Sequence, residues 1–368
     1  MTSKKYCLAL FLVISVFFIA NMVLWQTVSS NSFYDEDGHG DLSRMGMINM
    51  TSSLTHPIEY PQKHIEYSEV ADKLEQTHVD ILTIGDSFSN GSGGNYYQDY
   101  ICSEYGVSVM NVPCRPYNDA LKTFYILKNT GLLEQIKPRV IILESLTANM
   151  KERFGMKEPE QYDYTVEGFN QAQMAGRIKA DVQAQIAEEK LAPGIMVKAN
   201  AEFIKSWLRR MTNDDDYRFN DAVGIWKLNI RAFSNPGWED KLLFPLSNAN
   251  VRFEEQVVYN INNNLNDVAG YCEKQGIKLI LLPVSDKYDV YSPYFASPPS
   301  DWRENTVIND LKKLSHRYAI IDTTNSLRKV IESSDRSEYT DLFWADDMHY
   351  SWKANQIIVK EIMQNISN

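Results

Sequence analysis

Short, mainly apolar runs recur along this chain with stretches of helical spacing between them, and this alternation constrains the fold more than any other feature. The runs cover 79–84, 107–112, 140–143, 277–284 and 318–322. Strands buried on both faces carry such continuous apolar runs, and parallel strands need long, usually helical, connections. We therefore predict an α/β fold, a three-layer sandwich with a central parallel sheet.

The segments that follow these runs have helical spacing. We expect helices over 96–105, 118–135 and 351–365, with Asn118 as the N-cap of the second and Gly276 ending a helix before the fourth strand. Alternation of strands and helices in this order is typical of one doubly covered sheet.

At the N-terminus, Lys4 and Lys5 precede a nearly uninterrupted apolar run over 6–25. About 20 apolar residues span the hydrocarbon core of a bilayer, and flanking lysines favour the cytoplasmic side. We expect residues 1–26 to form a single-pass transmembrane anchor in the cell membrane, with the rest of the chain extracytoplasmic. The alternative is a signal peptide cleaved at the small residues 28–30.

Composition divides the remainder into three parts. Residues 27–70 are polar and irregular, and we expect a tether. Residues 71–368 form the predicted domain, interrupted over about 151–250 by a helical insertion with helices near 169–190 and 195–211. Insertions of this kind often shape access to a site.

The charge balance excludes one class of partner. The chain carries 37 Lys and Arg against 48 Asp and Glu, a net charge of −11. Nucleic-acid binders present a basic face, so we expect no nucleic acid as partner. The acidic run Asp214-Asp215-Asp216 does not by itself make a calcium site, which needs several converging oxygens. We expect no metal and no cofactor.

Three cysteines, Cys102, Cys114 and Cys272, lie in the part expected outside the cytoplasm, and Cys7 lies in the anchor. An oxidising compartment permits a disulfide, for which Cys102 with Cys114 is the first pairing to test. Buried free thiols are the alternative, and the odd number leaves at least one thiol unpaired.

The first candidate for chemistry is Gly85-Asp86-Ser87-Phe88-Ser89, directly after a strand. Ligands of parallel α/β sheets bind at the carboxyl ends of the strands, so a serine on a tight turn there lies at the reactive edge. Backbone amides at the start of a following helix can stabilise an oxyanion. A purely structural turn between strand and helix is the alternative.

The second candidate is Asp346-Asp347-Met348-His349, just before the last expected helix. A serine hydroxyl needs a base within hydrogen-bond reach, and a carboxylate that orients the histidine raises its basicity. We predict Ser87 as nucleophile, His349 as base and Asp346 as the orienting carboxylate. Asp347 is the alternative carboxylate, and a surface or capping role is the alternative for His349.

These two segments resemble the first and last motifs of the SGNH hydrolases, also called GDSL esterases. The resemblance covers about 78–150 and 251–366, and it implies a flavodoxin-like sheet with the roles just given for Ser87, Asp346 and His349. Two family motifs are absent. No glycine follows the second strand, so the oxyanion amide is expected from Cys114 or Arg115, and Leu143 to Asn149 replaces the family's Gly-x-Asn-Asp string.

These departures, together with the anchor, resemble the exported polysaccharide O-acyltransferase branch, which includes proteins like alginate O-acetyltransferase and the D-alanyl transfer protein. The segment 276–291 is similar to that branch as well. Within it, Lys287, Tyr288 and Tyr291 follow a strand and are expected to contact substrate or, alternatively, to form a solvated loop with packed tyrosines. Arg115 is a candidate for binding an anionic sugar.

We therefore expect an exported serine acyltransferase that O-acylates, most simply O-acetylates, a cell-surface polysaccharide through an acyl-Ser87 intermediate. Cytoplasmic acetyl-CoA does not reach an exported enzyme, so the resemblance implies a multi-span membrane O-acyltransferase as partner. Two alternatives stay open: an exported carbohydrate esterase or deacetylase, and a non-catalytic protein of polysaccharide assembly.

Overall fold

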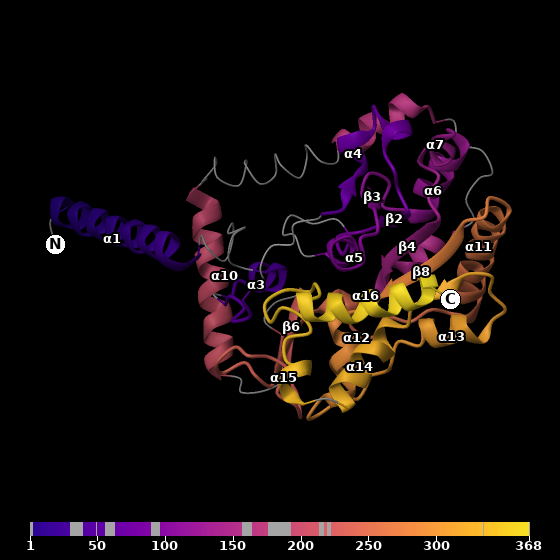
Figure 1. The fold of residues 1–368 in the computed structure, drawn as a ribbon. Helices are drawn as coiled ribbons and strands as arrows, with labels where there is room; N and C mark the ends of the chain where they lie inside the picture. The colour runs from indigo at the N-terminus through magenta and orange to yellow at the C-terminus, as the bar shows by residue number, and fades with distance from the viewer. Residues whose placement is uncertain are drawn as a thin grey trace. The chain divides into compact units, whose positions relative to one another are not determined.

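The computed structural model describes residues 3–29, 40–48, 50–55, 63–89, 96–156, 164–175, 193–212, 217–218, 222–333 and 335–367 (Figure 1). The chain divides into two compact units. One unit comprises Met1–Leu54, Asp181–Ser247 and Trp344–Met348, and the other comprises Thr55–Ala180, Asn248–Phe343 and His349–Asn368.

The second unit is built on a parallel sheet of six strands in the order β1-β3-β2-β4-β8-β9. The strands are β1 (Ile65–Glu66), β2 (Ile81–Gly85), β3 (Val109–Pro113), β4 (Val140–Leu146), β8 (Lys278–Val284) and β9 (Ala319–Ile320). The predicted parallel sheet is therefore confirmed, with each predicted apolar run overlapping one strand.

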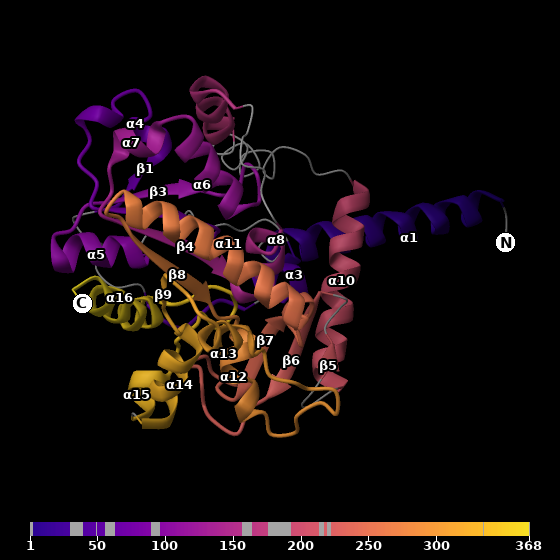
Figure 2. The same ribbon diagram turned by 90° about the vertical axis from the view of Figure 1, so that its right-hand side faces the viewer.

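Helices cover both faces of this sheet (Figure 2). On one face α6 contacts β2 and α11 contacts β8, and on the other α5 contacts β3 and α14 contacts β8. The longer helices of this unit are α5 (Tyr97–Tyr105), α6 (Ala120–Asn129), α11 (Glu255–Lys274), α13 (Val307–Lys313), α14 (Thr323–Ser333) and α16 (Trp352–Ser367), with a further helix over 166–175.

Shorter helical segments connect these elements. They are α4 (Tyr67–Val70), η2 (Leu74–Gln76), α7 (Leu132–Ile136), η3 (Thr147–Asn149), α8 (Met150–Phe154), α12 (Lys287–Tyr291), η5 (Ser292–Tyr294) and α15 (Arg336–Tyr339). The helix expected over 118–135 is thus two helices, because the chain turns at Gly131, which has a φ of 75°. Asp119, not Asn118, caps α6 by accepting from the Lys122 amide at 2.9 Å.

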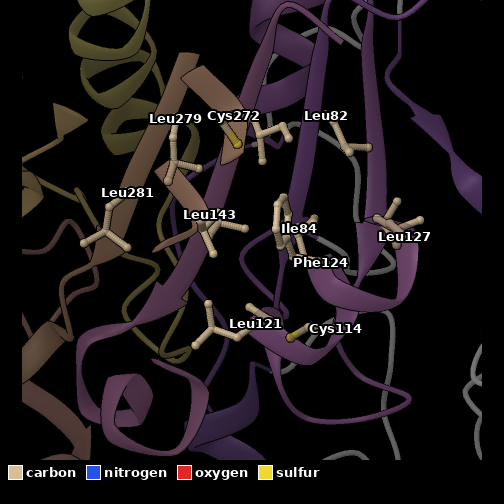
Figure 3. Close-up of a cluster of buried hydrophobic side chains, with 14 of the residues drawn as sticks. Leu82, Ile84, Cys114, Leu121, Phe124, Leu127, Leu143, Cys272, Leu279 and Leu281 are labelled. Carbon is tan, nitrogen blue, oxygen red and sulfur yellow. The ribbon is translucent and has the colours of Figure 1, made fainter. Parts of the chain in front are cut away.

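The face of the sheet toward α6 and α11 carries the main apolar core (Figure 3). Side chains alternate along a strand, so Leu82 and Ile84 of β2 point to this face and pack among residues of α6 and α11. The opposite face is partly polar: Thr83 donates to Asn111 Oδ1 at 2.9 Å, and Gln98 of α5 donates to Thr83 Oγ1 at 3.4 Å. This polar layer continues to the end of β2.

The cysteines of this unit belong to the buried layers. Cys114 and Cys272 lie in the apolar core of Figure 3, Cys102 is buried on α5, and all are free thiols. The proposed Cys102–Cys114 disulfide is therefore wrong, and the alternative of buried thiols holds. Burial raises the pKa of Cys102 to about 11 and those of Cys114 and Cys272 to about 12.

The first unit begins with α1 (Ser3–Leu24) and the π-helical turn η1 (Trp25–Ser29). Together they form one helix of 27 residues, long and apolar enough to cross a membrane; its most apolar 18-residue stretch has a mean hydropathy of 2.7 and no buried residues. The unit also contains α3 (Asp41–Gly46), α10 (Pro193–Thr212), η4 (Leu246–Asn248) at its border and an antiparallel sheet in the order β5-β6-β7.

Two expectations about the chain's organisation are corrected. The insertion is not wholly helical, because β5 (Tyr217–Arg218), β6 (Val223–Lys227) and β7 (Lys241–Pro245) form a sheet within it. Residues near the expected end of the tether belong to the second unit, where β1 pairs with β3. The acidic run 214–216 and most of the helix expected over 169–190 lie outside the described residues.

Candidate active site

Ser87 lies on the turn that leaves β2, at the carboxyl edge of the parallel sheet. β2 is hydrogen-bonded to β3 on one side and to β4 on the other, and the chain visits β3 before β4. Such a switch in strand order opens a crevice in which ligands of open α/β sheets bind. Ser87 is exposed while its neighbours Gly85 and Phe88 are buried, so the hydroxyl is the accessible group of this turn.

Asp86 builds the turn that presents Ser87. Its Oδ1 accepts from the Phe88 amide at 3.0 Å, and its Oδ2 accepts from the Leu146 amide at 3.1 Å and from the Arg153 guanidinium. Burial alone would raise the pKa of Asp86, but the Arg153 charge and the two amides outweigh it and hold this pKa below its ordinary value. Asp86 is therefore an ionised, structural carboxylate.

Glu144 of β4 supports the same turn from beneath. Its Oε2 accepts from the Asp86 amide and from Ser89 Oγ, each at 2.8 Å. Burial and then the charge of Asp86 raise the pKa of Glu144 well above its usual range, so this acid keeps its proton. Both bonds fall on Oε2, and Oε1 has no hydrogen-bond partner in the described part of the chain.

The close approach of Glu144 explains the glycine before the motif. A Cβ on Gly85 would lie 2.3 Å from Glu144 Oε2 and 2.4 Å from Ser89 Oγ. No side chain fits in that space without moving the carboxyl group or the turn. The glycine is thus required by packing at this position, beyond the tightness of the turn itself.

His349 meets Ser87 across 261 intervening residues, with Nε2 2.8 Å from Oγ. For Nε2 to accept the hydroxyl proton, Nδ1 must carry the ring proton. The Phe88 ring lies 4.7 Å from the imidazole and 5.2 Å from the ring of Tyr350. Tyr350 Oη accepts from the Ser285 amide at 2.9 Å, which ties this segment to the end of β8.

The carboxylates before the histidine have other contacts within the first unit. Asp346 Oδ2 accepts from the Gly40 amide at 2.9 Å, and Asp347 Oδ2 accepts from the Asp41 amide at 3.1 Å. A carboxylate has about four acceptor positions, so these bonds leave capacity for a further donor. The role of Asp346, or of Asp347, in orienting His349 stays a prediction.

Two backbone amides after β3 were expected as possible donors to an oxyanion, and one of them already donates to a backbone carbonyl. The Cys114 amide donates to the Gly85 carbonyl at 2.9 Å, an extension of the β2–β3 pairing, so Cys114 is not the donor we predicted. The amides of Arg115 and Ser87 make no hydrogen bond to any residue that the structure describes. The Arg115 side chain is exposed, as binding of an anionic sugar would require.

The predicted contact of Lys287 and Tyr288 with substrate is corrected. These residues open helix α12 and are buried, with exposed fractions of 0% and 2%. Tyr288 Oη donates to Asn250 Oδ1 at 3.2 Å, and its amide donates to Asp286 Oδ1 at 2.7 Å. Tyr291 is buried as well, so this cluster is part of the protein interior.

Sequence reasoning missed the buried polar groups under Ser87, namely Glu144 and Arg153. One signal was present: Glu144 is a charged residue that directly follows the apolar run 140–143, and a buried acid there needs partners or a proton. Comparisons with protein-family models, with curated proteins and with solved structures found no match for this chain.

Proposed function

We propose that this chain is a membrane-anchored, extracytoplasmic serine acyltransferase of the SGNH type that O-acylates a cell-surface polysaccharide. One observation carries the proposal: the exposed Ser87 hydroxyl lies 2.8 Å from His349 Nε2. A nucleophile and a base within hydrogen-bond reach, at the carboxyl edge of a parallel sheet, are the minimum for covalent acyl transfer.

In the proposed reaction, Ser87 Oγ attacks the carbonyl carbon of an acyl donor while His349 Nε2 takes the hydroxyl proton. The tetrahedral intermediate collapses as its bond to the leaving oxygen breaks, and His349 returns the proton to that oxygen. An acceptor hydroxyl then loses its proton to Nε2 and attacks the acyl-Ser87 carbonyl. Ser87 leaves with the proton from His349, which restores the free enzyme.

The charges around the turn suit this chemistry. The carbonyl oxygen becomes negative in both tetrahedral intermediates, and the amides of Ser87 and Arg115 are the proposed donors to it. Asp86 is neutralised by Arg153, and Glu144 is protonated, so the buried acids add little negative charge beneath the reacting oxygen. Asp346 is the proposed partner of Nδ1–H of His349.

The acceptor and the acyl source follow from the proposed location. Lys4 and Lys5, in the first turn of α1, favour an orientation with the sheet outside the cytoplasm, where envelope polysaccharides offer hydroxyl groups. The acyl group is then supplied across the membrane, for which a multi-span O-acyltransferase is the proposed partner. Neither role requires a metal or an organic cofactor.

The test uses the full chain in detergent with p-nitrophenyl acetate as acyl donor. The proposal predicts an acetyl group on Ser87, detected by peptide mass spectrometry, in the wild type and not in His349→Gln. Ser333→Ala is the matched control, because Ser333 is an exposed serine whose hydroxyl donates to the Lys329 carbonyl of its own helix. Absence of acetyl-Ser87 in the wild type would contradict the proposal.

A second measurement separates transfer from hydrolysis. Deacetylated alginate oligosaccharide is added as acceptor, and acetylated oligosaccharide is compared with free acetate. Acetylated product above acetate supports a transferase. Acetate alone, with Ser87 still required, favours the carbohydrate esterase instead.

A further inference from the structure

Helix α10 carries an exposed apolar face that the catalytic proposal does not use. Ile204, Trp207, Leu208 and Met211 are 44%, 50%, 49% and 63% exposed. Their spacing of three, four and seven residues places them on one side of the helix. A contiguous exposed apolar surface of this kind marks contact with a partner or a lipid phase.

This helix is fixed to the end of α1 within the first unit. The Asn200 amide group donates to the Asn21 carbonyl oxygen at 2.8 Å and to Asn21 Oδ1 at 3.0 Å. Trp25, directly after α1, is buried with Met196 and Ala199 of α10. In both ribbon views α10 runs across the end of α1 and not along it (Figures 1 and 2).

The apolar face lies on the same side of α10 as Asn200, which contacts α1. Asn200 precedes Ile204 by one helical turn, and Leu208 follows Ile204 by another, so all three lie on one side of the helix. Ser206 points elsewhere, because its hydroxyl is buried and donates to the Gly46 carbonyl at 2.9 Å. The exposed apolar face is therefore directed toward α1, and Ser206 toward α3.

The depth of this contact matches the boundary of a bilayer. From Lys4 to Asn21, α1 extends about 26 Å at about 1.5 Å per residue. The hydrocarbon core of a membrane is about 30 Å thick. If the lysines lie at one surface, the contact between Asn21 and Asn200 lies near the other.

The remaining side of α10 is polar and mostly basic. Lys198, Glu202, Lys205 and Arg209 repeat at intervals of three and four residues, away from the apolar face. Lysines beside an apolar face that contains a tryptophan are typical of helices lying in the plane of a membrane surface, where basic groups meet anionic headgroups.

We propose that α10 lies in the lipid–water interface of the membrane that α1 crosses, with its 204–211 face among the acyl chains. The proposal is independent of the catalytic function, and it rests on α1 being a membrane-spanning helix. Its consequence is that the first unit is held on the membrane by two elements: α1 passes through the bilayer and α10 lies flat on it.

The test places nitroxide labels on the full chain in vesicles of phosphatidylethanolamine and phosphatidylglycerol. In a Cys7→Ser background the other cysteines are buried, so added cysteines take the label. Leu208→Cys and Met211→Cys probe the apolar face, and Lys205→Cys is the matched control on the polar side. Val13→Cys reports separately whether α1 is in the bilayer.

At 208 and 211 we expect collisions with oxygen, which is concentrated in lipid, to exceed collisions with a water-soluble nickel complex, with the order reversed at 205. Equal access of the nickel complex at 208 and 205 would overturn the proposal. Low access to both reagents at 208 would also overturn it, in favour of a covering protein. If the label at Val13→Cys collides mainly with oxygen but the label at Leu208→Cys collides mainly with the nickel complex, the anchor stands and only the proposed role of α10 is refuted. If the label at Val13→Cys collides mainly with the nickel complex, the membrane anchor on which the proposal rests is refuted.

Discussion

Replacing His64 with glutamine should remove a pH dependence of stability that one buried imidazole produces. His64 Nδ1 lies 2.8 Å from Asp99 Oδ1, and Nε2 lies 3.0 Å from Glu66 Oε1. The side chain is only 10% exposed, so solvent screens these contacts weakly. His64 thereby links the β1 segment to the start of α5.

The size of the effect follows from the two protonation states. Burial alone would lower the pKa of His64, but its bonds to Asp99 and Glu66 outweigh burial and raise this pKa from 6.5 to about 9. Each pKa unit corresponds to about 1.4 kcal/mol, so protonated His64 stabilises the fold by about 3 kcal/mol. Because the folded state binds the proton more tightly, this stability is complete below pH 6.5 and is lost as pH rises through about 9.

The assay is urea unfolding of the full chain in detergent, followed by circular dichroism at pH 6.5 and pH 9. We expect the free energy of unfolding to fall by about 3 kcal/mol between these pH values in the wild type and to change far less in His64→Gln. His316→Gln, which alters an exposed histidine, is the matched control. An equal pH dependence in the wild type and His64→Gln would refute the assignment.

Three further predictions concern the buried groups. Gly85→Ala should lower the free energy of unfolding by about 1–3 kcal/mol in urea, because its Cβ displaces the Glu144 carboxyl group; unchanged stability would contradict the packing argument. Glu144→Gln mimics the protonated acid, so its free energy of unfolding should stay within about 1 kcal/mol of the wild-type value. Glu144→Ala should lower the free energy of unfolding by more, because it leaves the Asp86 amide unpaired. Equal losses in the two variants would contradict a protonated Glu144. The three buried thiols should be unreactive toward maleimide in the folded protein, and all three should react after unfolding in urea with no reductant present. If two of them formed a disulfide, those two would stay unreactive.

The sequence predicts the parallel sheet well because its strands are buried on both faces. β2, β4 and β8 appear as apolar runs whatever their neighbours are, and each ends within three residues of its expected boundary. The antiparallel sheet is different. β6 contains Gly224 and ends at Lys227, and β7 begins at Lys241, so neither shows a clean apolar pattern.

In the candidate site, too, the residues that belong to local motifs are predictable and their long-range partners are not. Ser87 and His349 are each predictable from a local motif, because a strand end and a helix start place them at known edges of the sheet. The partners of buried groups depend on long-range geometry. The Cys114 amide donates to the Gly85 carbonyl because of the β2–β3 register, and Glu144 meets Ser89 only because β4 pairs with β2. His64 looked like part of a tether because its two carboxylates are recognisable only in the folded chain.

The central claim is that His349 activates Ser87 as a nucleophile, and the rate of reaction with a fluorophosphonate tests it most directly. The full chain in detergent is treated with the probe, and the modified residue is mapped by peptide mass spectrometry. We predict a stoichiometric adduct on Ser87 in the wild type and in Ser333→Ala, and its loss in His349→Gln with the fold retained. An unmodified Ser87 in the folded wild type, or an equal rate in His349→Gln, would contradict the account.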